Sequence, residues 1–120
     1  MLRTETVERG TFELLKILMQ DEYLKNFNLV GGTALALYMG HRKSIDLDLF
    51  SPQPFNTNDL EEYLINAYNF DKYKSSNVTL MGYINGIKID CLQYNYPNVK
   101  PINNIDGVRL LSIQDIAAMK

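Results

Sequence analysis

The chain of 120 residues contains one cysteine, Cys91, and no tryptophan. A single cysteine cannot form a disulfide within the chain, so cross-links do not hold this fold together, and a reducing cytoplasm is the expected location. Cys91 lies in an apolar strand pattern with no base nearby in sequence to activate it, which predicts a buried core thiol rather than a reactive one.

Long hydrophobic runs and a strong charge imbalance are also missing. No segment reaches the ~18 consecutive apolar residues of a membrane span, and the first residues lack the apolar core of a signal peptide, so we expect no membrane partner. The formal net charge is −2. This value excludes a broadly basic surface for nucleic acid but leaves room for a local basic patch.

The length and the apolar patterning predict one α/β (α+β) domain over residues 1–120, a small mixed sheet flanked by helices. Helical spacing is found at about 4–25, 33–39 and 58–68 and after Ser112, and strand patterns at about 27–30, 45–50, 77–84 and 87–94. Asn58 with Glu61, and Ser112 with Asp115, resemble helix N-caps. Asn85-Gly86 predicts a hairpin turn, and residues 95–108 are expected to be irregular.

The most informative stretch runs from a glycine pair, Gly31-Gly32, to two acidic residues, Asp46 and Asp48. The segment Ile45-Asp46-Leu47-Asp48-Leu49-Phe50 alternates apolar and acidic residues, which indicates a strand. Residues two apart in a strand share a face, so both carboxylates should project together while their neighbours enter the core. Such a pair repels unless a cation lies between, and its oxygens suit Mg²⁺ or Mn²⁺.

A third carboxylate, Asp90, interrupts the apolar strand at 87–94. If that strand lies beside the one at 45–50, Asp90 can face Asp46 and Asp48 and complete a site for two metal ions. A salt bridge with Lys88 is disfavoured here, on the reasoning that strand neighbours point to opposite faces. Asp46, Asp48 and Asp90 are therefore the predicted metal ligands and catalytic residues.

The glycine pair fits a phosphate ligand. Backbone N–H groups of Gly31 and Gly32, at a strand-to-helix turn capped by Thr33, can approach a phosphate closely, helped by the positive end of the helix. Basic side chains at Arg42, Lys43 and Lys120 could offset the charge of a triphosphate. These six residues form the predicted nucleotide-binding set, and the lone histidine, His41, is expected to be structural.

These motifs resemble the AbiEii/AbiGii toxin family of nucleotidyltransferases, within the polymerase-beta-like superfamily. The match rests on Gly-Gly-Thr-Ala-Leu-Ala-Leu, Gly-His-Arg-Lys-Ser and Asp-Leu-Asp-Leu-Phe, with Ile-Lys-Ile-Asp and the segment from Ser112 to Lys120 after them. The resemblance implies a minimal nucleotidyltransferase fold and a toxin-type enzyme. Such an enzyme would transfer a nucleoside monophosphate (NMP) from an NTP to an acceptor, a tRNA end in some members, and would have a cognate antitoxin.

The resemblance also leaves alternatives open. Family members usually continue past the lysine matched by Lys120 into a helical region, which this sequence does not include. The chain is then a nucleotidyltransferase core, or a catalytically incomplete module of the same fold that binds a nucleotide or a protein. A third interpretation is a metal-dependent phosphodiesterase that uses the same carboxylates with water as the acceptor.

Overall fold

The structure is a computed structural model that describes residues 9–39, 46–93, 102–105 and 107–118. The helices are α1 (Arg9–Met19), the short 3-10 helix η2 (Glu22–Leu24), α2 (Gly31–Met39), α3 (Thr57–Tyr68) and α4 (Ile113–Ala118). The strands are β1 (Asn28–Val30), β2 (Leu47–Ser51), β3 (Asp71–Ser75), β4 (Thr79–Ile84), β5 (Ile87–Gln93), β6 (Asn103–Ile105) and β7 (Val108–Leu110). The predicted α/β class is confirmed. No helix in these ranges is long and apolar enough to cross a membrane.

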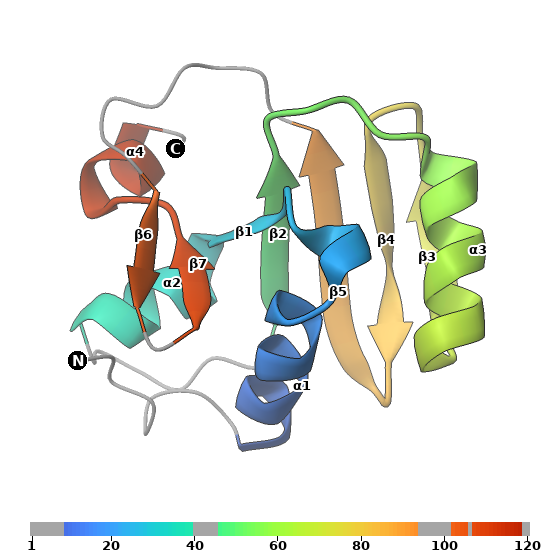
Figure 1. The fold of residues 1–120 in the computed structure, drawn as a ribbon, viewed down its shortest axis with the longest axis horizontal. Coiled ribbons are helices and arrows are strands. Elements are labelled where there is room, and N and C mark those ends of the chain that lie inside the picture. Colours follow the sequence, from blue (N-terminus) through green and yellow to red (C-terminus); the bar gives the residue numbers. More distant parts are fainter. Residues whose placement is uncertain (1–8, 40–45, 94–101, 106, 119–120) are drawn as a thin grey trace.

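One mixed sheet organises the molecule (Figure 1). Its seven strands lie in the order β3-β4-β5-β2-β1-β7-β6. β2 pairs with β5, and β1 with β7, in parallel, and the remaining pairs are antiparallel. Strands far apart in the sequence thus become neighbours, and the parallel pair of β2 and β5 brings the two predicted acidic strands together, as expected.

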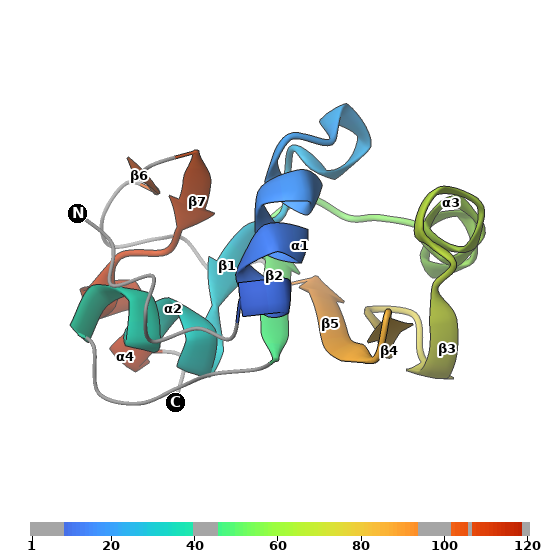
Figure 2. The same cartoon turned by 90° about the horizontal axis from the view of Figure 1, so that it is seen from below.

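Helices cover the two faces of the sheet unequally (Figure 2). α1 and α3 lie on one side, and α2 and α4 lie on the other side, near β1 and β7. α2 packs against β1, β2 and α4, while α3 packs against β3 and β4. The face of β5 and β4 that points away from α1 and α3 is therefore left without a covering helix among the described residues.

Several local predictions are confirmed. Asn85 and Gly86 have φ angles of 53° and 80°, which is the backbone of a two-residue hairpin turn. The hydroxyl of Ser112 accepts a hydrogen bond from the backbone N–H of Asp115 at 3.1 Å and so caps α4. Cys91 is buried, as predicted, and burial raises the pKa of its thiol to about 12.

Other boundaries differ from the prediction. The cap of α3 is Asn56 rather than Asn58, because Asn56 has an extended backbone and its side chain accepts from the N–H of Asp59 at 3.0 Å. The first helix ends at Met19 rather than near Lys25, because the Asp21 side chain caps η2 instead. α2 begins at Gly31, so the glycine pair opens the helix and Thr33 is not its cap.

Three strands lie where none was predicted. All residues of β3 are exposed, so it lacks the alternation of apolar and polar residues that marks a half-buried strand. β6 and β7 have three residues each, too few for a readable period, and they occupy part of the segment expected to be irregular. These short strands extend the sheet beyond β1 and leave its centre at β2 and β5.

Arg109 ties β7 to the segment before β1, and its replacement tests how much this anchor contributes. Its guanidinium donates hydrogen bonds to the main-chain oxygens of Met19, Leu24 and Phe27 at 2.9, 3.0 and 3.1 Å. We expect Arg109→Met to lower the free energy of unfolding by about 3 kcal/mol, since half-buried carbonyl groups lose charged donors. Arg9→Met is the control, because its salt bridge with Glu13 is exposed and should contribute under ~0.5 kcal/mol. Equal urea midpoints for the two variants would contradict this role.

Candidate active site

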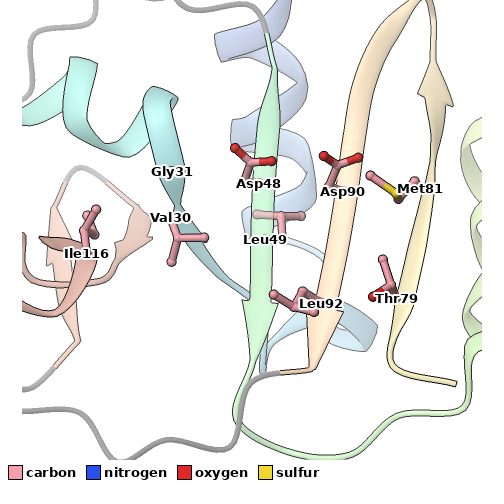
Figure 3. A pocket seen from close by; sticks show the side chains of 9 residues that line it. All are labelled: Val30, Gly31, Asp48, Leu49, Thr79, Met81, Asp90, Leu92 and Ile116. Carbon is pink, nitrogen blue, oxygen red and sulfur yellow. The ribbon is translucent and has the colours of Figure 1, made fainter. Parts of the chain in front are cut away.

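Two acidic residues lie side by side at the centre of the sheet. The parallel register of β2 and β5 places Asp48 opposite Asp90. Figure 3 shows both carboxylates on the same side of the two strands, one beside the other. Their strand neighbours Leu47, Leu49, Ile89 and Cys91 are buried. The alternation read from the sequence therefore holds, with the carboxylates on one face and the apolar side chains on the other.

The closeness of the two carboxylates changes the acidity of Asp48. Burial, followed by the negative charges of Asp90 and Asp46, raises the pKa of Asp48 to about 6, and the charge of Lys88 opposes this shift. At neutral pH Asp48 is still mainly ionised, so two negative charges stand next to each other. Such a site favours a cation.

Asp90 has one oxygen with a partner and one without. Oδ2 lies 3.5 Å from Nζ of Lys88. Oδ1 is buried, and no hydrogen-bond donor reaches it from the described parts of the chain. A buried carboxylate oxygen without a donor is costly unless a cation or water coordinates it. The donor set at this point therefore fits a hard divalent cation such as Mg²⁺ or Mn²⁺.

The salt bridge between Lys88 and Asp90 corrects the sequence reasoning. The two residues are two positions apart, so they share a face of β5 instead of pointing to opposite faces. The period of a strand was the signal that could have revealed this pairing. The negative charges of Asp90, then Asp46 and Asp48, raise the pKa of the Lys88 ammonium. All three carboxylates therefore stabilise its positive charge.

Asp46 is half-buried and lies directly before β2. Its main-chain oxygen accepts a hydrogen bond from the hydroxyl of Thr33, which is buried in α2. Within the described residues, no three His, Cys, Asp or Glu side chains form a group that could hold a metal ion. The structure thus assembles the pair of Asp48 and Asp90, and Asp46 as a third ligand stays a prediction.

Gly31 allows Asp48 to approach the start of α2. Gly31 has a φ of 75°, and a Cβ atom on it would lie 2.3 Å from Oδ2 of Asp48. Any side chain at this position would therefore displace the carboxylate. Gly31 and Gly32 are the first residues of α2, where backbone N–H groups lack helical partners. Phosphate contact by these glycines, and by Thr33, stays a prediction.

A pocket of about 340 Å³ opens beside the two carboxylates. Figure 3 shows the side chains that line it. They come from β1, α2, β2, β4, β5 and α4: Val30, Gly31, Asp48, Leu49, Thr79, Met81, Asp90, Leu92 and Ile116. The walls are mostly apolar and the carboxylates supply the charge, which is the usual composition of a small-molecule site.

A row of paired residues crosses the sheet at the level of the carboxylates. Val30 pairs with Asp48, Asp48 with Asp90, Asp90 with Met81, and Met81 with Lys74. Residues opposite each other on neighbouring strands point to the same face. The row therefore ends in a lysine on the face that carries the carboxylates.

A β-bulge explains why Lys74 lies on that face. The register of β3 against β4 shifts between Lys72 and Lys74. Lys72 is placed opposite Gly82 and forms a salt bridge with Glu61 of α3 at 3.6 Å, on the other side of the sheet. Lys74 lines a second pocket, which shares Thr79 and Met81 with the first. Bulges commonly redirect a side chain in this way. Lys74 was not among the predicted ligands because β3 has no strand pattern in the sequence.

The remaining predicted ligands cannot be placed. Arg42 and Lys43, the neighbouring His41, and Lys120 lie outside the described residues. Their roles in nucleotide binding stay predictions.

Solved structures of other proteins share the fold, among them the following three. The CCA-adding enzyme of Thermotoga maritima complexed with tRNA has a TM-score of 0.58 and 22% identity, over 75% of this chain and 22% of the enzyme. JHP933 from Helicobacter pylori has a TM-score of 0.57 and 18% identity, over 94% and 56%. A candidate nucleotidyltransferase from Thermotoga maritima has a TM-score of 0.58 and 17% identity, over 99% and 85%.

The family follows from the sequence itself. Residues 13–120 match the family described as nucleotidyl transferase AbiEii toxin, type IV toxin–antitoxin system. The chain therefore belongs to the AbiEii family, as the resemblance of its motifs predicted. It is also 34% identical over 99 residues to an uncharacterised protein of Aquifex aeolicus (strain VF5), covering 79% of this chain and 48% of that protein. The chain spans about half the length of this relative.

The raised pKa of Asp48 predicts an unusual effect of pH on stability. The folded state holds a proton up to about pH 6, whereas an unfolded Asp releases it near ~3.9. The folded state therefore loses stability as pH rises through this interval. In metal-free buffer at pH 8 we expect Asp48→Asn to be about 1–2 kcal/mol more stable than the parent chain, because one pKa unit is ~1.4 kcal/mol and partial exposure screens the charges.

Thermal melts at pH 5 and pH 8 measure this difference, which should shrink at the lower pH. Glu62→Gln is the control, because Glu62 is exposed on α3. A destabilised Asp48→Asn at pH 8, with a chelator present, would show that the two carboxylates do not repel in the folded chain.

Proposed function

We propose that this chain is the catalytic core of a metal-dependent nucleotidyltransferase that moves an NMP from an NTP to an acceptor hydroxyl. The proposal is supported by membership of the AbiEii family. The observation that carries it is the parallel pairing of Asp48 with Asp90, whose buried Oδ1 has no donor among the described residues. This arrangement suits a divalent cation and a negatively charged substrate held by it.

Asp48 and Asp90 would hold Mg²⁺ or Mn²⁺, with Asp46 as the third predicted ligand. When bound, such an ion polarises the phosphoryl oxygens and makes the acceptor hydroxyl more acidic. In the reaction the acceptor oxygen forms a bond to the α-phosphorus of the NTP. The bond from that phosphorus to the bridging oxygen breaks, and pyrophosphate leaves. Asp90 helps to remove the proton from the acceptor hydroxyl.

The other residues bind and orient the substrate. The N–H groups of Gly31 and Gly32, at the positive end of α2, would donate hydrogen bonds to phosphate oxygens beside Asp48. Lys74 stands at the far end of the paired row, two strands from Asp90, or ~10 Å at the usual strand spacing. We assign it a contact with the phosphates of the NTP. Arg42, Lys43 and Lys120 would add positive charge.

The acceptor is proposed to be a tRNA end. The support is the fold shared with the CCA-adding enzyme, which was solved in complex with tRNA. As a member of a toxin family of type IV toxin–antitoxin systems, the protein would be neutralised by a cognate antitoxin.

The second candidate function is a catalytically incomplete module that binds a nucleotide or a protein. This chain matches 48% of its Aquifex relative and 22% of the CCA-adding enzyme, so the activity of the whole protein is itself a proposal. Binding without turnover is its expected property. Binding and transfer are therefore measured separately below.

Calorimetric titration of each NTP, with and without Mg²⁺, tests the site directly. We expect the parent chain to bind NTP only with Mg²⁺. In Asp48→Asn and in Asp90→Asn the NTP affinity should fall at least tenfold, because each variant removes a charged metal ligand. Glu62→Gln should bind like the parent chain. Binding followed by transfer of labelled NMP to tRNA supports the enzyme, and binding without transfer supports the incomplete module as a nucleotide binder. No binding at millimolar NTP contradicts the enzyme and leaves a module that binds a protein.

Lys74 and Lys72 form a matched pair for a second test, since they lie on opposite faces of one strand. We expect Lys74→Met to weaken NTP binding about five- to tenfold, the loss of ~1–1.4 kcal/mol for one charged phosphate contact. Lys72→Met should change NTP affinity less than twofold while slightly lowering stability. Equal NTP affinities for the two variants would remove Lys74 from the binding site.

A further inference from the structure

Lys88 holds a position that the transfer reaction does not explain. Its ammonium lies 3.5 Å from Oδ2 of Asp90, on the face of β5 that also carries the pocket. The side chain of Lys88 is 37% exposed and that of Asp90 20% exposed. The ion pair therefore stands at the rim of the site, where the lysine can turn out into solvent while the carboxylate stays in place.

The Lys88–Asp90 pair occupies one oxygen of the carboxylate that would hold the metal ion. Oδ1 of Asp90 is buried and no donor from the described residues reaches it, whereas Oδ2 is paired with Lys88. A divalent cation shared between Asp48 and Asp90 would stand within a few ångströms of the ammonium, and two positive charges so close repel. The ammonium on Oδ2 therefore opposes a cation at Oδ1, and a cation can use both oxygens of Asp90 only after Lys88 has left Oδ2.

We propose that Lys88 is an internal counter-cation that competes with the divalent cation for Asp90 and so weakens binding of metal in the absence of nucleotide. The inference rests on the proposed metal site. While no nucleotide is bound, Lys88 limits the repulsion between Asp48 and Asp90. When a nucleotide enters with its cation, the ammonium is released and can turn toward the phosphates. Lys88 is thus a positioning residue that links metal loading to nucleotide binding.

The test measures Mg²⁺ and Mn²⁺ alone, by calorimetry on the full chain without nucleotide. We expect Lys88→Met to bind both ions about five- to tenfold more tightly than the parent chain, because the competing charge is gone and the aliphatic stem is kept. Lys88→Arg retains the charge and should stay within twofold of the parent. Lys72→Met, whose salt bridge lies on the other face with Glu61, should also leave the metal affinity unchanged.

Melting temperatures provide a readout that needs no catalysis. In metal-free buffer at pH 8, Lys88→Met should melt about 3–6 °C below the parent, because Asp90 loses its counter-charge beside Asp48. Saturating Mg²⁺ should raise the melting temperature of Lys88→Met more than that of the parent. Lys88→Arg should behave like the parent in both conditions.

The outcomes separate this inference from the proposed function. If the parent chain binds Mg²⁺ and Lys88→Met binds it equally or more weakly, the competition is refuted while the metal site stands. If neither binds Mg²⁺ at millimolar concentration, the metal site and the competition are both refuted. Tighter binding by Lys88→Met that disappears in Lys88→Met/Asp90→Asn supports both.

Discussion

The parallel pairing of β2 with β5 is the constraint on which the site depends. It holds Asp48 opposite Asp90, although the two negative charges repel. The energy that keeps them together comes from the other face of the same strands, where Leu47, Ile89 and Cys91 are buried. A slip of one residue would turn these side chains out of the core, so the register is strongly specified. Core packing therefore imposes the repulsion between the two carboxylates.

The same strand register places a positive charge on the face of the sheet that carries the acidic pair. The row that starts with Val30 and contains Asp48 and Asp90 ends with Lys74 on the outermost strand. The negative end of this surface suits a metal ion, and the positive end suits a phosphate. The surface is therefore complementary to a ligand that combines a metal ion with a polyphosphate. A bulge of one residue decides this pattern, because without it Lys74 would not share the face of Met81.

Part of this arrangement was readable from the sequence because it depends on strong local signals. Alternation predicted the face of Asp48, the Asn85-Gly86 turn predicted the hairpin, and the family motifs predicted that Asp90 belongs with Asp48. The third ligand, Asp46, and the basic residues Arg42, Lys43 and Lys120 remain predictions, since the structure does not assemble or describe them as one site.

The strand β3 with its bulge and the helix start at Gly31 could not be predicted from the sequence, for physical reasons. β3 is an exposed edge strand with no apolar period, so neither the strand nor the bulge that orients Lys74 leaves a pattern in the sequence. The helix start at Gly31 depends on tertiary contact, because the close approach of Asp48 requires a residue without a side chain. The pairing of Lys88 with Asp90, by contrast, followed from strand period and was misread.

Anomalous diffraction from crystals grown with Mn²⁺ and a non-hydrolysable NTP analogue would test the central claim most directly. The account predicts a manganese peak coordinated by Asp48 and Asp90, with the triphosphate beside Gly31 and Nζ of Lys88 displaced from Asp90. A nucleotide bound elsewhere, or a carboxylate pair without manganese and still in contact with Lys88, would contradict it.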